Sequence, residues 1–365
     1  MTCLLFTGDI AITNPPAEIL EPELKNLIKT YDLVSCNVEG PITSSDKTIK
    51  KIGPPISQPL SVFKKLKDSG FTLFNLANNH IGDYGLSAIN KTIKELEPLP
   101  TIGAGENFSQ AYGLYTKEME GAIFGFLSLA EWGFGAFDEL AVGGYAWINH
   151  PKVNTLIIDA KQIVDVLIIQ IHAGVENIDI PLPQWRSRYR ELIDLGADII
   201  IGHHPHTVQG DEIYASGHIF YSLGNFHFQK ANATKDWNSS IMVSLNYQGK
   251  KLLDWQIIPT RVVNEIVCLD ITPARLVDYK ERTNKLFVNY DDYIQKLIPI
   301  LWTERYQHFS KRAVGGFSSF KGLMRSLKNF LSGNEIDHLY MAHNQNIESH
   351  YYAISLFSKQ KIDRN

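Results

Sequence analysis

A short apolar run followed at once by a cluster of histidines constrains this chain more than any other feature. Residues 199–201 are consecutive isoleucines, a pattern typical of a strand buried on both faces of a parallel sheet. His203, His204 and His206 follow, and Pro205 stiffens the turn between them. Because ligands bind outside the carboxyl ends of strands in open α/β sheets, this turn is a first candidate site.

Polar side chains recur at the ends of the other predicted strands. A lone histidine pair or a capping aspartate is common in plain surface loops, but the repetition over successive strand–helix units favours one shared site. The predicted strands are 3–6, 32–38, 71–77 and 164–171, and with the histidine turn their ends supply Asp9, Glu39, Asn79, His80, His172, His204 and His206.

This set of side chains suits a hydrolytic centre with two metal ions. Such a centre needs a bridging carboxylate, imidazoles and neutral oxygen donors, which hold the cations about 3.5–4 Å apart and lower the pKa of a water molecule. A mixed oxygen and nitrogen set favours Mn, Fe or Zn. We therefore expect divalent metals, two in number, as cofactors.

Charge and length limit the class of protein. The 365 residues carry a net charge of -4, without the basic character of a nucleic-acid-binding protein. Neither a signal-peptide core nor the run of about 18 apolar residues of a membrane helix is found. Cys3, Cys36 and Cys268 are far apart and are expected to be reduced, buried thiols. We expect a cytoplasmic protein.

The character of the chain changes near residue 272. The pattern predicts one domain over 1–272 and a helical region over 273–365, with helices at 291–309, 320–331 and 347–358. This region either covers an edge of the main domain's sheet or docks a biosynthetic partner or a second copy of the chain. Its histidines, which lack ligand spacing, are expected to be ordinary surface or satisfied residues: His308, His338, His343 and His350.

The residues over 3–260 resemble the CapA family of capsule and poly-gamma-glutamate synthesis proteins. The motifs that carry the resemblance are GDI at 8–10, NVEGP at 37–41, LANNHIGDYG at 76–85, HAGVE at 172–176, GADIIIGHHPHTVQG at 196–210 and IFYSLGNFHF at 219–228. The resemblance implies an α/β fold similar to calcineurin-like metallophosphoesterases. We therefore expect a four-layer α-β-β-α sandwich with a helical C-terminal extension.

The resemblance also implies roles for single residues. Asp9 and His206 would bind the first metal, Glu39 would bridge, and Asn79, His172 and His204 would bind the second, with His203 left open as an alternative ligand. His80 would act on the scissile group, oriented by Asp83. The residues assigned to substrate binding are Asn78, Lys51, Glu176, His203 and Asn225. Lys51 belongs to a basic segment at 43–59, which is either a solvated loop or a lid for an anionic substrate.

Two positions depart from the metallophosphoesterase pattern. Ile10 and Ala11 follow Asp9, so the histidine of an Asp-x-His motif is missing, and Glu39 stands where an aspartate is usual.

The first functional interpretation is a metal-dependent hydrolase or transferase that acts in capsule, exopolymer or secondary-metabolite synthesis. Metal-activated water would attack a phosphoester, amide or gamma-glutamyl bond. The substrate would be an anionic small molecule or polymer. The alternative is a non-catalytic accessory subunit whose degenerate metal site binds a polymer or a protein.

Overall fold

Two β-sheets form the centre of the molecule. The computed structural model describes residues 1–137, 142–230, 237–313, 324, 328 and 336–362. The first sheet has the order β16-β15-β14-β1-β2-β3-β4, with β13 also paired to β1. Its strands β1 to β4 run parallel to one another. Their bounds are β1 Thr2–Ala11, β2 Leu33–Val38, β3 Leu73–Asn75, β4 Thr101–Ile102, β13 Asn225–Phe228, β14 Ser239–Gln248, β15 Lys251–Val263 and β16 Ile266–Leu269.

The second sheet has the order β11-β12-β10-β9-β7-β6. Strands β7, β9, β10 and β12 are parallel, whereas the two edge strands are antiparallel to their neighbours. Its strands are β6 Tyr115–Met119, β7 Ala122–Ala130, β9 Val166–His172, β10 Ile199–His203, β11 Asp211–Tyr214 and β12 Gly217–Phe220, and a separate pair is formed by β5 Ala104–Gly105 and β8 Gly144–Tyr145.

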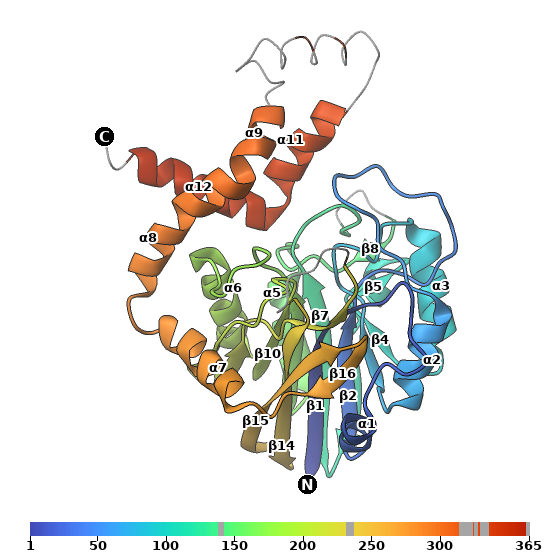
Figure 1. The fold of residues 1–365 in the computed structure, drawn as a ribbon. Helices are drawn as coiled ribbons and strands as arrows, with labels where there is room; N and C mark the ends of the chain where they lie inside the picture. The colour runs from blue at the N-terminus through green and yellow to red at the C-terminus, as the bar shows by residue number, and fades with distance from the viewer. Residues whose placement is uncertain (138–141, 231–236, 314–323, 325–327, 329–335, 363–365) are drawn as a thin grey trace.

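Helices cover the outer face of each sheet and the inner faces pack together, which gives four layers (Figure 1). In β1, Leu4 and Phe6 face the core between the sheets, and Leu5 faces the helices. Strands with both faces buried need largely apolar runs, as β9 and β10 have. The α-β-β-α sandwich is thus confirmed. The first sheet is covered by α1 Pro22–Ile28, α2 Leu60–Asp68 and α3 Leu86–Leu96, the second by α5 Val153–Ile163 and α6 Pro183–Asp194, and the short α4 spans Phe108–Ala111.

The first strand is longer than the sequence pattern indicated. The expected strand ends at residue 6, but β1 continues to Ala11 through a register shift beside Asp9. It pairs with β14 over residues 2–6 and then with β13, and a Cβ on Gly8 would lie 2.0 Å from the carbonyl oxygen of Gly224. Gly8 therefore does not break the strand, because it allows the close approach of the neighbouring chain.

The C-terminal helices that the structure describes lie within residues 273–313 and 336–362. They begin with α7, whose Thr283 and Tyr279 hydroxyls donate hydrogen bonds to Asp211 on the edge strand β11. The following helices lie beyond one end of the sandwich (Figure 1). Strand β16 and helices α7 and α11 were not predicted, and the helix expected at 320–331 lies largely outside the described residues. The elements are α7 Pro273–Lys285, α8 Tyr290–Leu301, a π-helix Trp302–Tyr306, α9 Gln307–Ala313, α11 Ile336–Asn346 and α12 Glu348–Ile362.

The other broad expectations concern the thiols, the domain division and membrane helices. All three cysteines are free, but only Cys36 is fully buried. A boundary near residue 272 remains a prediction, although α7 begins there. Within the part of the chain that the structure describes, no helix combines the length and the apolar character needed to cross a membrane.

Candidate metal centre

The buried carboxylate of Asp9 lies at the centre of the polar strand ends. Its Oδ1 accepts a hydrogen bond of 2.7 Å from the Asn37 amide, and its Oδ2 accepts one of 3.2 Å from the backbone N–H of His204. The Nδ1 atoms of His203 and His206 lie 3.3 and 3.5 Å from its oxygens. Burial alone would raise the pKa of Asp9, but the surrounding imidazoles hold it well below its ordinary value.

Glu39 follows β2 and is the second buried carboxylate. Among the described residues neither of its oxygens has a hydrogen-bond partner. The nearest imidazole nitrogens, Nε2 of His80 and Nε2 of His206, lie 3.6 and 4.0 Å from Oε1. Burial raises the pKa of Glu39 to about 8. A buried carboxyl group without hydrogen-bond partners is unfavourable by itself, and its position among imidazoles fits the role of a metal ligand.

Asp9, Glu39 and His172 form a cluster that fits a divalent cation. One ligand atom from each lies within 4.8 Å of the others, and all three side chains are buried. His172, at the end of β9, contacts the Asn79 amide oxygen and His204 Nδ1 through Nε2, each at 3.0 Å. The donor set therefore suits an oxygen- and nitrogen-binding metal.

The histidine turn after β10 is held in an unusual backbone conformation. His204 and His206 have φ angles of 91° and 56°, a region that costs non-glycine residues about 1–3 kcal/mol each. This turn directs both imidazoles toward the cluster. His206 Nδ1 lies 2.9 Å from the Asn225 amide oxygen, and His204 Nε2 lies 3.1 Å from Glu131 Oε1. Although burial opposes it, the neighbouring carboxylates raise the pKa of both histidines.

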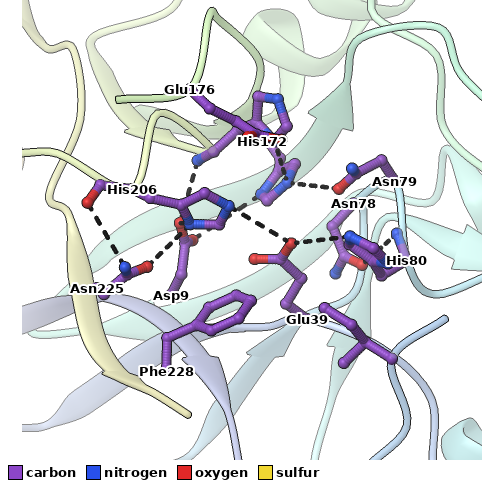
Figure 2. A network of polar contacts seen from close by, with 12 residues as sticks. Asp9, Glu39, Asn78, Asn79, His80, His172, Glu176, His206, Asn225 and Phe228 are labelled. Atoms are coloured by element: carbon purple, nitrogen blue, oxygen red, sulfur yellow. Dashed lines mark hydrogen bonds and ion pairs between the residues drawn. The ribbon is translucent and has the colours of Figure 1, made fainter. Parts of the chain in front are cut away.

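His80 lies on the opposite side of Glu39 from His206 (Figure 2). Its Nδ1 lies 2.7 Å from Oδ2 of Asp83, which also accepts a hydrogen bond from the backbone N–H of Ile56. Lys51 forms an ion pair with Asp83, and its ammonium lies 3.2 Å from His80 Nδ1. Burial and the charge of Lys51 together lower the pKa of His80. The basic segment at 43–59 thus reaches the site through Lys51.

The remaining candidates form hydrogen bonds within the chain, except His203, which has only its ion-pair contact with Asp9 among the described residues. The Asn78 amide oxygen accepts hydrogen bonds from the backbone N–H groups of His80 and Ile81, and its NH₂ group donates to the Val38 carbonyl. Its geometry supports the backbone turn, and its assignment to substrate binding stays a prediction. The carboxylate of Glu176 accepts a hydrogen bond of 2.7 Å from Arg305. Asn225 holds His206, whereas both ring nitrogens of the buried His203 lack hydrogen bonds to any described residue.

Three groups near the site were missed in the sequence. Asn37 links Asp9 to His172, with its amide nitrogen 3.1 Å from His172 Nδ1. Glu131 follows the apolar strand β7, so the strand-end rule that found Glu39 would have found it too. Arg305 had no such signal, because it lies on a C-terminal helix far from any predicted strand.

The expectation for two C-terminal histidines was wrong. His343 and His350 are neither exposed nor satisfied: both are buried, and neither Nδ1 has a partner in the described part of the chain. Helical packing placed them together, with ring centres 4.5 Å apart, and no sequence spacing indicated it.

A four-layer α/β sandwich with a carboxylate–imidazole cluster at its strand ends is the class of protein that the fold and the site define. Residues 3–230 match the family described as Bacterial capsule synthesis protein PGA_cap, and the chain therefore belongs to that family.

Two curated relatives carry names of the same family. The capsule biosynthesis protein CapA of Bacillus anthracis is 34% identical over 253 residues, which are 64% of this chain and 59% of that protein. The PGA biosynthesis protein CapA of Bacillus subtilis (strain 168) is 32% identical over 241 residues, 62% of this chain and 63% of that protein. The chain thus spans about three fifths of each relative. Among solved structures, a hypothetical protein from Thermus thermophilus is similar with a TM-score of 0.45 at 14% identity, over 72% of this chain and 100% of that one.

Proposed function

We propose that this chain is a metal-dependent hydrolase or transferase that cleaves a phosphoester bond during the synthesis of a capsule or another exopolymer. The observation that carries the proposal is the buried cluster of Asp9, Glu39 and His172, with ligand atoms within 4.8 Å of one another. Neither oxygen of Glu39 accepts a hydrogen bond from a described residue, which supports the binding of a cation there. The pathway is supported by the family and by the names of its two Bacillus relatives.

The metal ligands in this proposal are Asp9, Glu39 and His172, with Asn79, His204 and His206 around them. A divalent Mn, Fe or Zn ion held by such a set would lower the pKa of a water molecule and would neutralise charge on the oxygens of the scissile group. Asn225 holds His206, and Asn37 holds Asp9, so the imidazole and the carboxylate are oriented before a cation binds.

His80 is the proposed proton-transfer residue. Its Nδ1 is bound by Asp83, which leaves Nε2, the nitrogen nearest Glu39, to exchange a proton with the leaving oxygen. Asp83 and Lys51 are positioning residues, because their contacts fix the ring without reaching the reacting atoms. An amide or gamma-glutamyl bond would need the same proton transfer and is the second candidate for the bond that is cleaved.

Metal analysis and turnover of two chromogenic substrates test the proposal. Purified protein should contain stoichiometric divalent metal and hydrolyse bis-p-nitrophenyl phosphate, whereas gamma-glutamyl-p-nitroanilide tests the amide alternative. His80→Ala should lower kcat by about 10²- to 10⁴-fold without changing the metal content, since proton transfer contributes on that scale. His308→Ala, which removes a histidine of the C-terminal helices outside the site, is the matched control.

The accessory-subunit alternative gives a different result. Protein that binds no metal and turns over neither substrate, in wild type and variant alike, would contradict the enzymatic proposal. A turnover rate that is the same in wild type and His80→Ala would contradict only the proposed role of His80, not the metal-dependent reaction.

A further inference from the structure

A cavity of about 240 Å³ lies between the candidate metal centre and the C-terminal helices. One wall contains Asn79, His80 and His204 of the candidate centre. The opposite wall contains Arg305, His343 and His350. We call this space the tail cavity. The family match ends at residue 230, so the second wall comes entirely from outside the matched part of the chain.

The C-terminal helices are held against the sandwich by hydrogen bonds, two of them fully buried. Glu131, which contacts His204, accepts a hydrogen bond of 2.9 Å from the backbone N–H of Ser349. The Trp185 indole donates to the Ser349 hydroxyl at 2.8 Å, and the carboxylate of Glu348 accepts from the Asn149 amide at 2.7 Å. The second wall is therefore preorganised rather than loosely apposed.

The wall presents side chains that can donate hydrogen bonds, and the two carboxylates that also line the cavity, Glu176 and Glu131, already accept hydrogen bonds from Arg305 and Ser349. Arg305 donates to the carboxylate and the carbonyl oxygen of Glu176 at 2.7 and 3.2 Å, which uses only part of a guanidinium group that has five N–H donors. His343 and His350 are 9% and 8% exposed, and each has an Nδ1 that bonds no residue described by the structure. Buried polar atoms nearly always have a partner, so unpartnered ones beside a cavity indicate a ligand.

A local departure from α-helix brings Arg305 to this position. Pro299 in α8 cannot donate to the carbonyl of Gln295, which accepts a hydrogen bond from the Gln360 side chain of α12 instead. The π-helix at Trp302–Tyr306 follows, and Arg305 lies within it. Such segments are frequent at functional sites, because the extra residue in the turn redirects the side chains after it.

We propose that Arg305, His343 and His350 form an anion-binding subsite for the substrate. The substrate would then be a compact molecule or a chain end that carries a phosphate or carboxylate group in addition to the bond cleaved at the metal centre. The volume is below the range of about 300–1,000 Å³ that drug-sized ligands occupy, which favours a small anionic group over the interior of a polymer. The inference that this anion is part of the substrate rests on the proposed function. The inference that an anion binds here does not.

Calorimetric titration of the full-length protein with inorganic phosphate, and separately with glutarate, tests the subsite and distinguishes a phosphate from a carboxylate. Both titrations are done after EDTA treatment, so that metal ions cannot bind the anion. One of the two anions should bind, and Arg305→Gln should weaken that binding about 10- to 100-fold, the loss of a charge-assisted hydrogen bond. Lys280→Gln, which removes an exposed positive charge from α7, should leave it unchanged.

His350→Phe gives a second, uncharged test. The ring lies among Tyr306, Phe309 and His343, so phenylalanine, whose ring is slightly larger, keeps an aromatic side chain there and removes the polar nitrogens. It should weaken anion binding without lowering the thermal midpoint of unfolding by more than a few degrees.

The outcomes separate this inference from the proposed function. Anion binding that is equal in wild type, Arg305→Gln and His350→Phe, or that is absent with both anions, would overturn the subsite even if the protein hydrolyses phosphoesters. Binding that depends on Arg305 in a protein without hydrolytic activity would support the subsite and overturn only the proposed reaction.

Discussion

The buried carboxyl group of Glu39 should make the metal-free protein less stable as the pH rises. In the unfolded chain the pKa of this group is near 4.5, and in the folded chain burial raises it to about 8. Between these values the folded chain holds the proton more tightly, so the free energy of unfolding falls with increasing pH. Relative to the fully protonated group, this loss of stability amounts to about 0.8 kcal/mol at pH 5 and about 3.3 kcal/mol at pH 7, a difference of about 2.5 kcal/mol.

Glu39→Gln isolates this contribution, because glutamine has nearly the same shape and does not titrate. Urea unfolding in the presence of EDTA should show the free energy of unfolding of wild type falling by about 2.5 kcal/mol relative to the variant between pH 5 and pH 7. Well above pH 8 the two curves should become parallel. Glu95→Gln, on the exposed surface of α3, should follow wild type throughout. Parallel curves for wild type and Glu39→Gln from pH 5 upward would refute the reasoning.

Two further predictions follow from contacts around the site. Lys51→Met should raise the pKa of His80 in an NMR titration, because the nearby ammonium group disfavours the imidazolium. The control Lys47→Met, in the same basic segment, should leave that pKa unchanged. An unchanged His80 pKa in Lys51→Met would contradict the contact between Lys51 and His80. Gly8→Ala should destabilise the protein by several kcal/mol in urea unfolding or prevent its folding, because the new Cβ would lie 2.0 Å from the Gly224 carbonyl oxygen. Normal stability of the variant would mean that β1 and β13 can separate at little cost in free energy.

The layered fold could be predicted because its strands are local features of the sequence. The largely apolar runs at Leu33–Val38, Val166–His172 and Ile199–His203 each favour burial on two faces, and a sheet between other layers provides it. The end of β1 was placed too early because Gly8 suggests a break in isolation. A glycine is needed at position 8 because of a tertiary contact with Gly224, which is more than two hundred residues away along the chain, so no local sequence signal shows it.

The two walls of the tail cavity differed in how far the sequence could predict them. Side chains such as Asn79 and His204 follow strands, and parallel strands end at one edge of a sheet, so their convergence was predictable. Arg305, His343 and His350 lie on helices whose packing depends on a proline and a π-helix, and their sequence spacing matches no ligand pattern. Helical periodicity indicates that such segments exist but does not determine where each of them docks.

Glu131 has a consequence for communication within the molecule. One carboxylate contacts His204 on the histidine turn and the first turn of α12 through Ser349. A displacement of that imidazole on capture of a cation would therefore have to be transmitted to the helix or break a buried contact. Helix α12 is thus coupled to the site at the strand ends through Glu131. Amide hydrogen exchange in α12 would therefore report cation binding at residues that are far away along the polypeptide.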